Sequence, residues 1–195
     1  MKPIAIAIKA IPDIETGRRL HTIQNLSDDG VVKAMLHLHQ QKTGLENLPA
    51  YLQKILVMVL VQEQNGKLDS TVLSGETMDE PQLLQEYLRL SQGKQQITWN
   101  GQAFEYALIQ YRLLKHNIKP FPDFSKQIDI TKHLSLNTNN IPPSLNEMLC
   151  LLDLPHKSLP TNNTWEHYLK NEYQPIQKSA IEKAENIMRI YQRMF

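Results

Sequence analysis

Residues 4–16 read Ile-Ala-Ile-Ala-Ile-Lys-Ala-Ile-Pro-Asp-Ile-Glu-Thr, and the first part of this stretch predicts a central strand of a sheet. Isoleucine alternates with alanine from Ile4 to Ile8, and successive side chains of a strand point to opposite faces. The small side chains on one face indicate that another element packs closely there, so both faces are covered. Pro12 ends the strand, because it has no N–H to donate to a neighbouring strand.

The remainder of the chain alternates between strand and helix patterns, which predicts an α/β fold with a mixed sheet and helices on its faces. Asn65-Gly66 separates two strand-like stretches and predicts a hairpin, since both residues tolerate a positive φ. Ser144 and Glu147 form a capping box that predicts the start of another helix. The other expectations are a loop over 13–26, helices over 26–39, 81–90, 102–116 and 175–193, strands over 54–64, 67–73 and 95–99, and a long loop over 117–143 with a short ordered piece near 128–134.

The bulk composition is that of an ordinary globule of one domain, spanning residues 1–195. A formal net charge of +1 gives no overall basic field, so a nucleic-acid ligand would need a local patch. The single cysteine cannot form an internal disulfide, and the longest apolar run, at 55–61, is too short to span a bilayer. Without a secretory signal pattern, we expect a cytoplasmic protein that does not enter a membrane.

Three stretches together resemble one family. The first is IPDIETGRRL at 11–20 with LSDDGVVKAMLHLHQQKTGLENLPAYLQKILVMVLV at 26–61. The second is ITWNGQAFEYALIQYRLLKHNI at 97–118, and the third is SLNEMLCLLDLPHK with TWEHYL at 144–169. They are similar to the predicted PolB-like 3′–5′ exonucleases, within the DnaQ/ribonuclease H-like superfamily. The resemblance implies a ribonuclease H-like mixed sheet with helices on both faces. It also implies a site where acidic residues hold two metal ions, Mg²⁺ or Mn²⁺, that activate a water and stabilise the leaving oxygen.

The family's first strand ends in Phe-Asp-Ile-Glu-Thr-Ile/Val-Pro-Asp. Aligning its Pro-Asp with Pro12 and the following Asp13 places Ala7 at the catalytic Asp and Lys9 at the catalytic Glu. The Asp-Ile-Glu-Thr beginning at Asp13 then lies six residues too late, about 20 Å along an extended chain. The two metals of such sites are only about 4 Å apart. We therefore interpret Asp13 and Glu15 as solvated loop carboxylates. A relocated site would require the chain to fold back at Pro12.

The other family positions are also altered. Trp-Asn-Gly-x-x-Phe-Asp matches residues 99–104 and then places Glu105 at the metal-binding Asp, with a side chain one methylene longer. Tyr-x-x-x-Asp of the last helix falls on Ser179 and Lys183, and a shift of one residue would bring Glu182 to the Asp position. Asp129 resembles a further family aspartate, which serves the structure or lies near the substrate.

Substrate contacts in the family groove are implied for Trp99, Asn100 and Phe104. The aromatic pair could stack on bases, as aromatic side chains do in single-strand grooves. Both aromatic residues could equally belong to the core.

Two lysines at positions of metal-binding acids argue against a bound metal, because Mg²⁺ and Mn²⁺ require hard oxygen ligands and an ammonium group repels them. A lysine buried there needs an anionic partner. We therefore hypothesise that Lys9 forms an ion pair with Glu105 and that no metal or other cofactor is bound.

Two functions follow from these observations. The first is an exonuclease fold without nuclease activity that binds single-stranded nucleic acid weakly or binds a protein partner. The alternative is an active 3′–5′ exonuclease that holds Mg²⁺ or Mn²⁺ with unusual acidic ligands, drawn from Asp13, Glu15, Glu105, Asp129, Glu182 and Glu185. The sequence has no Cys-x-x-Cys pair for structural zinc and no Gly-x-Ser-x-Gly elbow for a serine hydrolase.

Overall fold

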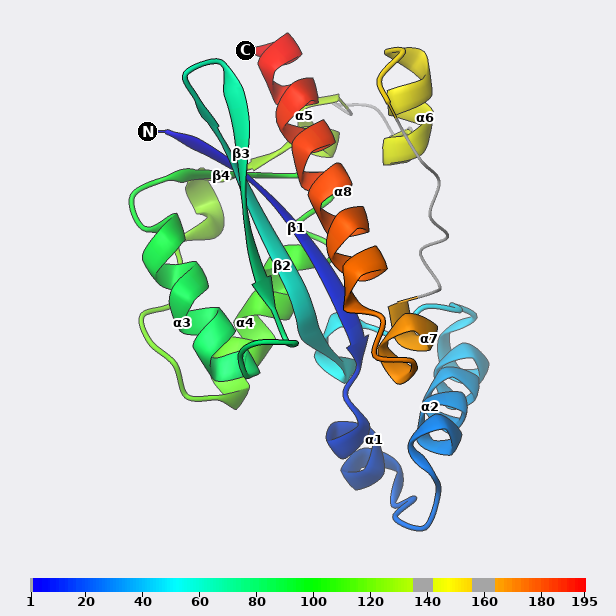
Figure 1. The fold of residues 1–195 in the computed structure, drawn as a ribbon. Helices are drawn as coiled ribbons and strands as arrows, with labels where there is room; N and C mark the ends of the chain where they lie inside the picture. Colours follow the sequence, from blue (N-terminus) through cyan, green and yellow to red (C-terminus); the bar gives the residue numbers. More distant parts are fainter. Residues whose placement is uncertain (1, 135–141, 156–163) are drawn as a thin grey trace.

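A single mixed sheet organises the computed structural model, which describes residues 2–134, 142–155 and 164–195 (Figure 1). The strand order is β3-β2-β1-β4-β5, with β1 pairing antiparallel to β2 and parallel to β4. The pairs β2–β3 and β4–β5 are antiparallel and parallel, respectively. The strands are β1 Pro3–Pro12, β2 Gln53–Gln64, β3 Lys67–Ser74, β4 Gln95–Thr98 and β5 Ile128–Asp129. The predicted mixed sheet and the central place of β1 are thus confirmed.

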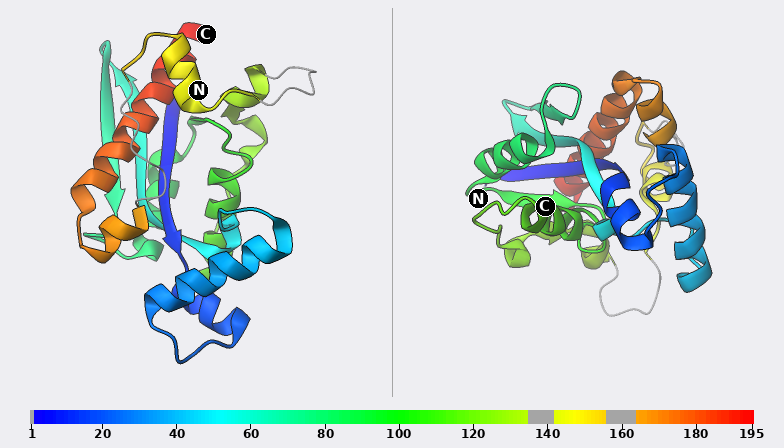
Figure 2. Two further views of the ribbon diagram at one scale, coloured as in Figure 1. Left: turned by 90° about the vertical axis from the view of Figure 1, so that its right-hand side faces the viewer. Right: turned by 90° about the horizontal axis from the view of Figure 1, so that it is seen from below.

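Helices cover both faces of this sheet (Figure 2). The helix α8 lies along one face, while α3 and α4 cover the other. The short α1 and the longer α2 pack on one another beyond the end of β1. The helices are α1 Ile14–His21, α2 Asp28–Thr43, α3 Glu80–Ser91, α4 Glu105–Lys115, α5 Ile130–Leu134, α6 Leu145–Leu151, α7 Thr164–Leu169 and α8 Tyr173–Met194, with 3₁₀ turns η1 Ala50–Leu52 and η2 Phe124–Lys126.

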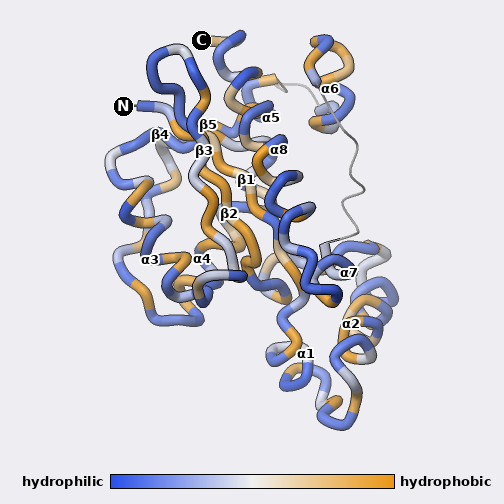
Figure 3. Tube along the Cα trace, in the orientation of Figure 1, coloured by the Kyte–Doolittle hydropathy of each residue, from blue (hydrophilic) through white to orange (hydrophobic). Residues whose placement is uncertain are grey.

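The two faces of β1 belong to two hydrophobic cores, as its alternating sequence predicts. Ile4 and Ile6 pack in the core beneath α3 and α4. Ala5 and Ala7 pack in the core beneath α8, which also contains alanines of that helix. The central strands are accordingly the most hydrophobic part of the chain trace (Figure 3). Because the alanines of β1 and α8 share this core and have small side chains, the backbone of α8 can lie close to β1.

The hairpin prediction is confirmed, since Asn65 and Gly66 link β2 to β3 with φ values of 53° and 75°. The predicted loop over 13–26 is wrong in its first half, which forms α1. Asp13 is the N-cap of this helix, and its side chain accepts a hydrogen bond from the backbone N–H of Thr16. Gly17 allows α1 to lie against Met35 of α2, a tertiary contact that no local pattern reveals.

Part of the predicted loop over 117–143 and the end of the 144–157 stretch lie outside the described residues. Among the described residues, no helix combines the length and the apolar character needed to cross a membrane.

Candidate functional site

The candidate site lies where β1, α4 and α8 meet. Alternation along β1 places Lys9 on the same face as Ala7, the face that α8 covers. Directly after Lys9 the pairing of β1 with β2 shifts register, which marks a bulge. Such bulges re-aim the side chains next to them. Glu105 begins α4, and Lys183 lies in the middle of α8.

Glu105 and Lys183 form an ion pair at the centre of this site. The Nζ atom of Lys183 lies 2.6 Å from Oε1 of Glu105. Glu105 is only 1% exposed, whereas the Lys183 side chain is 28% exposed. A buried carboxylate is stable only when it is paired or hydrogen-bonded. Lys183 therefore supplies the positive charge that Glu105 needs.

Lys9 lies near this pair without joining it. Burial and the neighbouring Lys183 together lower the pKa of Lys9 to about 8, although Glu105 opposes both effects. The hypothesised ion pair between Lys9 and Glu105 is wrong: within the described part of the chain, the cation within ion-pair distance of Glu105 is Lys183. The reason is geometric, because Lys183 reaches the carboxylate from α8 across the face that β1 and α8 share.

The residues of this site do not fit a pair of divalent metal ions. The five sequence-predicted positions supply one carboxylate, two ammonium groups, a methyl group and a hydroxyl group, from Glu105, Lys9, Lys183, Ala7 and Ser179. Mg²⁺ and Mn²⁺ favour several carboxylate or carbonyl oxygens, and the ammonium groups would repel them. Over the described ranges, no group of three or more His, Cys, Asp or Glu side chains is arranged to hold a metal.

Asp129 has a structural role at the end of the sheet. Its buried carboxylate accepts hydrogen bonds from the backbone N–H groups of Asn100 and Gln102, at 2.9 and 3.1 Å. It also accepts from the backbone and the hydroxyl of Thr131. These bonds fix the turn between β4 and α4 and thereby the position at which Glu105 enters the site.

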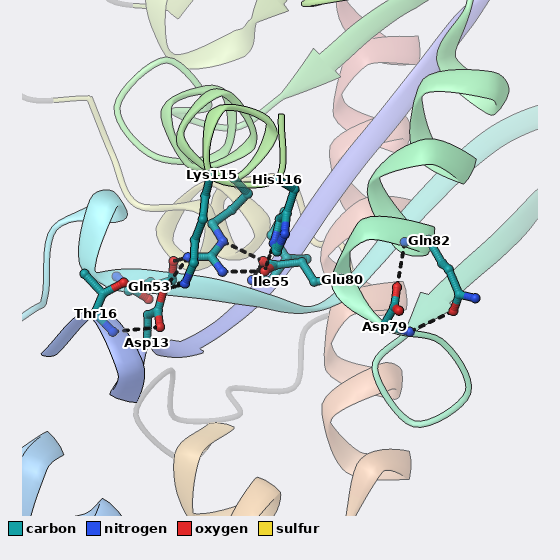
Figure 4. Close-up of polar contacts among 10 residues, drawn as sticks. Asp13, Thr16, Gln53, Ile55, Asp79, Glu80, Gln82, Lys115 and His116 are labelled. Atoms are coloured by element: carbon teal, nitrogen blue, oxygen red, sulfur yellow. Dashed lines mark hydrogen bonds and ion pairs between the residues drawn. The ribbon is translucent and has the colours of Figure 1, made fainter. Parts of the chain in front are cut away.

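Asp13 is buried, so the interpretation of this residue as a solvated carboxylate is wrong. It is 2% exposed, and its Oδ2 atom lies 2.5 Å from Nη1 of Arg112 and 2.6 Å from Nζ of Lys115 (Figure 4). Burial alone would raise the pKa of Asp13, but the bonds from Lys115, Arg112 and Thr16 hold it well below its usual range. The chain does turn at Pro12, but the turn places Asp13 beside two cations, Arg112 and Lys115. Glu15 is exposed on α1.

Arg112 connects Asp13 to a second acid that the sequence analysis does not identify. Its guanidinium donates to both oxygens of Glu80, through Nε at 2.8 Å and Nη2 at 2.5 Å. Glu80 also contacts the ring of His116 at 2.9 Å and accepts from the backbone N–H of Ile55 (Figure 4). A sequence signal for this network exists, because Arg112 lies four residues after buried Leu108 and so falls within the apolar stripe of α4.

The predicted substrate contacts are distributed between core and surface. Trp99 is 7% exposed and belongs to the core beneath α8, so little of its ring is available for stacking. Phe104 is partly buried against the opposite core. Asn100 is exposed, with a positive φ of 59° in the turn after β4.

The other acids of the alternative ligand set do not converge on this site. Glu185 pairs with Arg189 one turn further along α8, and it accepts a hydrogen bond from Ser70 of β3. Glu182, the alternative for the last helix, neighbours Lys183 in sequence, but it is Lys183 that contacts Glu105.

The family comparisons agree with the fold. The structure is similar to that of the family B DNA polymerase from the hyperthermophilic archaeon Pyrobaculum calidifontis, with a TM-score of 0.65 and 7% sequence identity. The match covers 100% of this chain and 24% of the polymerase chain, so this chain spans about a quarter of that protein. At this identity the likeness shows the fold alone, which is the predicted ribonuclease H-like arrangement.

Among curated proteins, none matches the sequence. Residues 46–194 match a family model described as "Predicted 3'-5' exonuclease related to the exonuclease domain of PolB". The matched region contains Glu105, Ser179 and Lys183, whereas β1 with Ala7 and Lys9 precedes it. Since the match covers most of the chain, this protein belongs to the family of predicted 3′–5′ exonucleases related to the exonuclease domain of PolB.

Proposed function

We propose that this exonuclease-like domain does not cleave nucleic acid but binds single strands weakly at the site formed by Lys9, Glu105 and Lys183. The observation that carries the proposal is the 2.6 Å contact between Lys183 and Glu105. The carboxylate at a metal-binding position of the family is thereby neutralised by an ammonium group of the same chain.

The chemistry of the three side chains supports binding without cleavage. Metal ions promote hydrolysis by lowering the pKa of a bound water and by stabilising the leaving oxygen. An ammonium group coordinates no water in this way, although it can attract a phosphate. The site contains two lysines and one glutamate, so its net charge is positive. A positive site favours binding of the negatively charged phosphodiester backbone.

Weak binding follows from the small number of cations. Each phosphate contact to a single strand contributes a slope of about 0.7 to the dependence of log affinity on log salt concentration. Since Lys183 is already paired with Glu105, the site has one positive charge in excess and predicts a slope of about −0.7. The formal net charge of +1 for the chain adds no strong long-range attraction.

Fluorescence anisotropy with 5′-labelled single-stranded DNA and RNA, in buffer containing EDTA, tests the binding. We expect Lys9→Met to weaken binding and to reduce the salt slope by about 0.7, because one phosphate contact is lost. Lys178→Met is the matched control, since Lys178 is exposed on α8. Equal binding by both variants would contradict the proposed site.

A nuclease assay tests the loss of activity against the alternative of an active exonuclease with unusual ligands. The labelled DNA and RNA are incubated with millimolar Mg²⁺ or Mn²⁺, and we expect no shortening from the 3′ end. Glu105→Gln serves as the control for contaminating nucleases. Metal-dependent shortening by the natural protein that is absent in Glu105→Gln would overturn the proposal.

A protein partner is the second candidate, and the near-neutral charge of the chain favours it. If neither DNA nor RNA binds, the nucleic-acid proposal fails and the protein-partner candidate is favoured.

A further inference from the structure

A pocket of about 880 Å³ lies at the other end of α4 from Glu105. Its walls are the C-terminal half of α3, the beginning of β4, and the segment that follows α4. Figure 1 shows this segment returning beside α3. Since α4 has 11 residues, about 16 Å of helix separates its two ends. The pocket is therefore separate from the site described above.

Positive charge predominates along this pocket. Arg89, Lys94 and Lys119 line it, and neither lysine forms an ion pair within the described part of the chain. Arg89 contacts Glu86 on the exposed surface of α3. Burial, Lys2 and Arg89 together lower the pKa of Lys94, which shows that several cations gather around it.

The acid among the described lining residues, Asp123, offsets only one of the three positive charges. Asp123 accepts hydrogen bonds from the backbone and the hydroxyl of Ser125, at 3.0 and 2.6 Å. These bonds cap the 3₁₀ turn η2, so the carboxylate has a local structural role. The pocket thus presents cations to an incoming ligand.

One of the lining amides is largely buried. Gln96 lines the pocket and is 3% exposed. Its Oε1 atom accepts from the Tyr87 hydroxyl at 2.8 Å, which fixes the orientation of the amide. An amide has two N–H donors as well as an acceptor oxygen, so the NH₂ group of Gln96 can donate to a bound group.

The remaining walls combine further amides with apolar surface. Gln85, Gln92, Asn117 and Gln127 are lining amides, and Leu88, Ile118, Pro120 and Pro122 are apolar. Amides can donate and accept at once, as the edge of a nucleobase requires. The volume falls in the range of about 300–1,000 Å³ typical of small-molecule sites.

We propose that this pocket binds a nucleotide, with its phosphates at Lys94 and Lys119 and its base against the amides near Gln96. This site does not depend on the proposed single-strand binding at Lys9 and Lys183, because it shares no residue with that site. The recognised chemistry is a phosphorylated nucleoside, in which the cations hold the charge and the amides and apolar walls hold the base.

Isothermal titration of the full chain with ATP, GTP, CTP and UTP tests this proposal, with adenosine and inorganic tripolyphosphate as separate probes. We expect at least one nucleotide to bind more tightly than either probe. The variant Lys94→Glu/Lys119→Glu should weaken that binding at least tenfold. The control variant Lys178→Glu, with the same type of charge reversal on exposed α8, should leave it unchanged.

A second variant separates base recognition from charge. Gln96→Met removes the amide while keeping a similar volume, and we expect it to weaken nucleotide binding but not tripolyphosphate binding. Circular dichroism confirms that each variant folds. The proposal is overturned if no nucleotide binds, if tripolyphosphate binds as tightly as the nucleotides, or if Lys94→Glu/Lys119→Glu binds normally. Loss of nucleotide binding in Lys9→Met would also overturn it, by assigning the ligand to the other site.

Discussion

Single charged side chains set the electrostatic character of the candidate site. Glu105 keeps the negative charge of a family metal ligand, but Lys183 neutralises it from α8. The family resemblance predicts that these positions lie close together. It does not predict which of two lysines contacts the acid, because lysine side chains are long and flexible and their choice of partner depends on how α8 is rotated.

Among the substitutions considered, we expect Arg112→Met to lower the free energy of unfolding most. Arg112 is 3% exposed and bonds to both Asp13 and Glu80, so Arg112→Met removes a cation that two buried carboxylates share. We expect a loss of about 3–5 kcal/mol in the free energy of unfolding, measured with urea. Arg89→Met removes an exposed ion pair with Glu86 and should change stability little. A similar small effect at both arginines would show that the buried network is not needed for stability.

The pKa of Lys9 predicts a pH dependence of stability. Its value in the folded protein is lowered from about 10.5 to about 8, so between these pH values the unfolded chain binds more protons. The contribution of Lys9 to the free energy of unfolding therefore increases as the pH rises from about 8 towards 10.5. Urea unfolding at both ends of this window should show a gain that is absent in Lys9→Met. An identical pH dependence in both proteins would mean that Lys9 is not desolvated by the fold.

Local sequence patterns predict three strands of the sheet, but they miss the short helix α1. Alternating patterns and the Asn65-Gly66 turn locate β1, β2 and β3, because these signals are local. The helix α1 is missed since its glycine, Gly17, is unfavourable in a helix by about 1 kcal/mol. Close packing against Met35 requires that glycine, and this contact exists only once α1 and α2 have docked.

The turn between β4 and α4 depends on the glycine at position 101. A Cβ atom added at Gly101 would lie well inside contact distance of the Thr98 side chain. We expect Gly101→Ala to destabilise the fold by about 1–3 kcal/mol, because both residues are held within a well-packed turn. Gln102→Ala, at the exposed neighbouring position, is the control. Equal thermal denaturation of these two variants would contradict the close approach of Gly101 to Thr98.

The whole molecule combines a fold that the sequence predicts with a charge network that it does not. The mixed sheet follows from the order of elements and from the family resemblance. The contacts of Asp13 do not, since its partners Arg112 and Lys115 are 99 and 102 residues away along the chain. Asp13 belongs to a sequence that resembles a nuclease motif, yet the fold uses it to join α1 to α4.

At this scale we also expect that restoring the family's acids restores metal binding. The variant Ala7→Asp/Lys9→Glu/Glu105→Asp/Lys183→Asp replaces both lysines and supplies carboxylates from β1, α4 and α8. Without metal these acids repel one another and lower the melting temperature. A metal that binds the folded state raises it again by mass action.

Melting temperatures with and without millimolar Mn²⁺, for the natural protein and for this acid-restored variant, show whether Lys9 and Lys183 exclude a metal ion from the site. We expect no shift for the natural protein, whose lysines repel the ion, and a clear rise for the variant. A rise of similar size in the natural protein would contradict this expectation, because the site would then hold a metal despite Lys9 and Lys183.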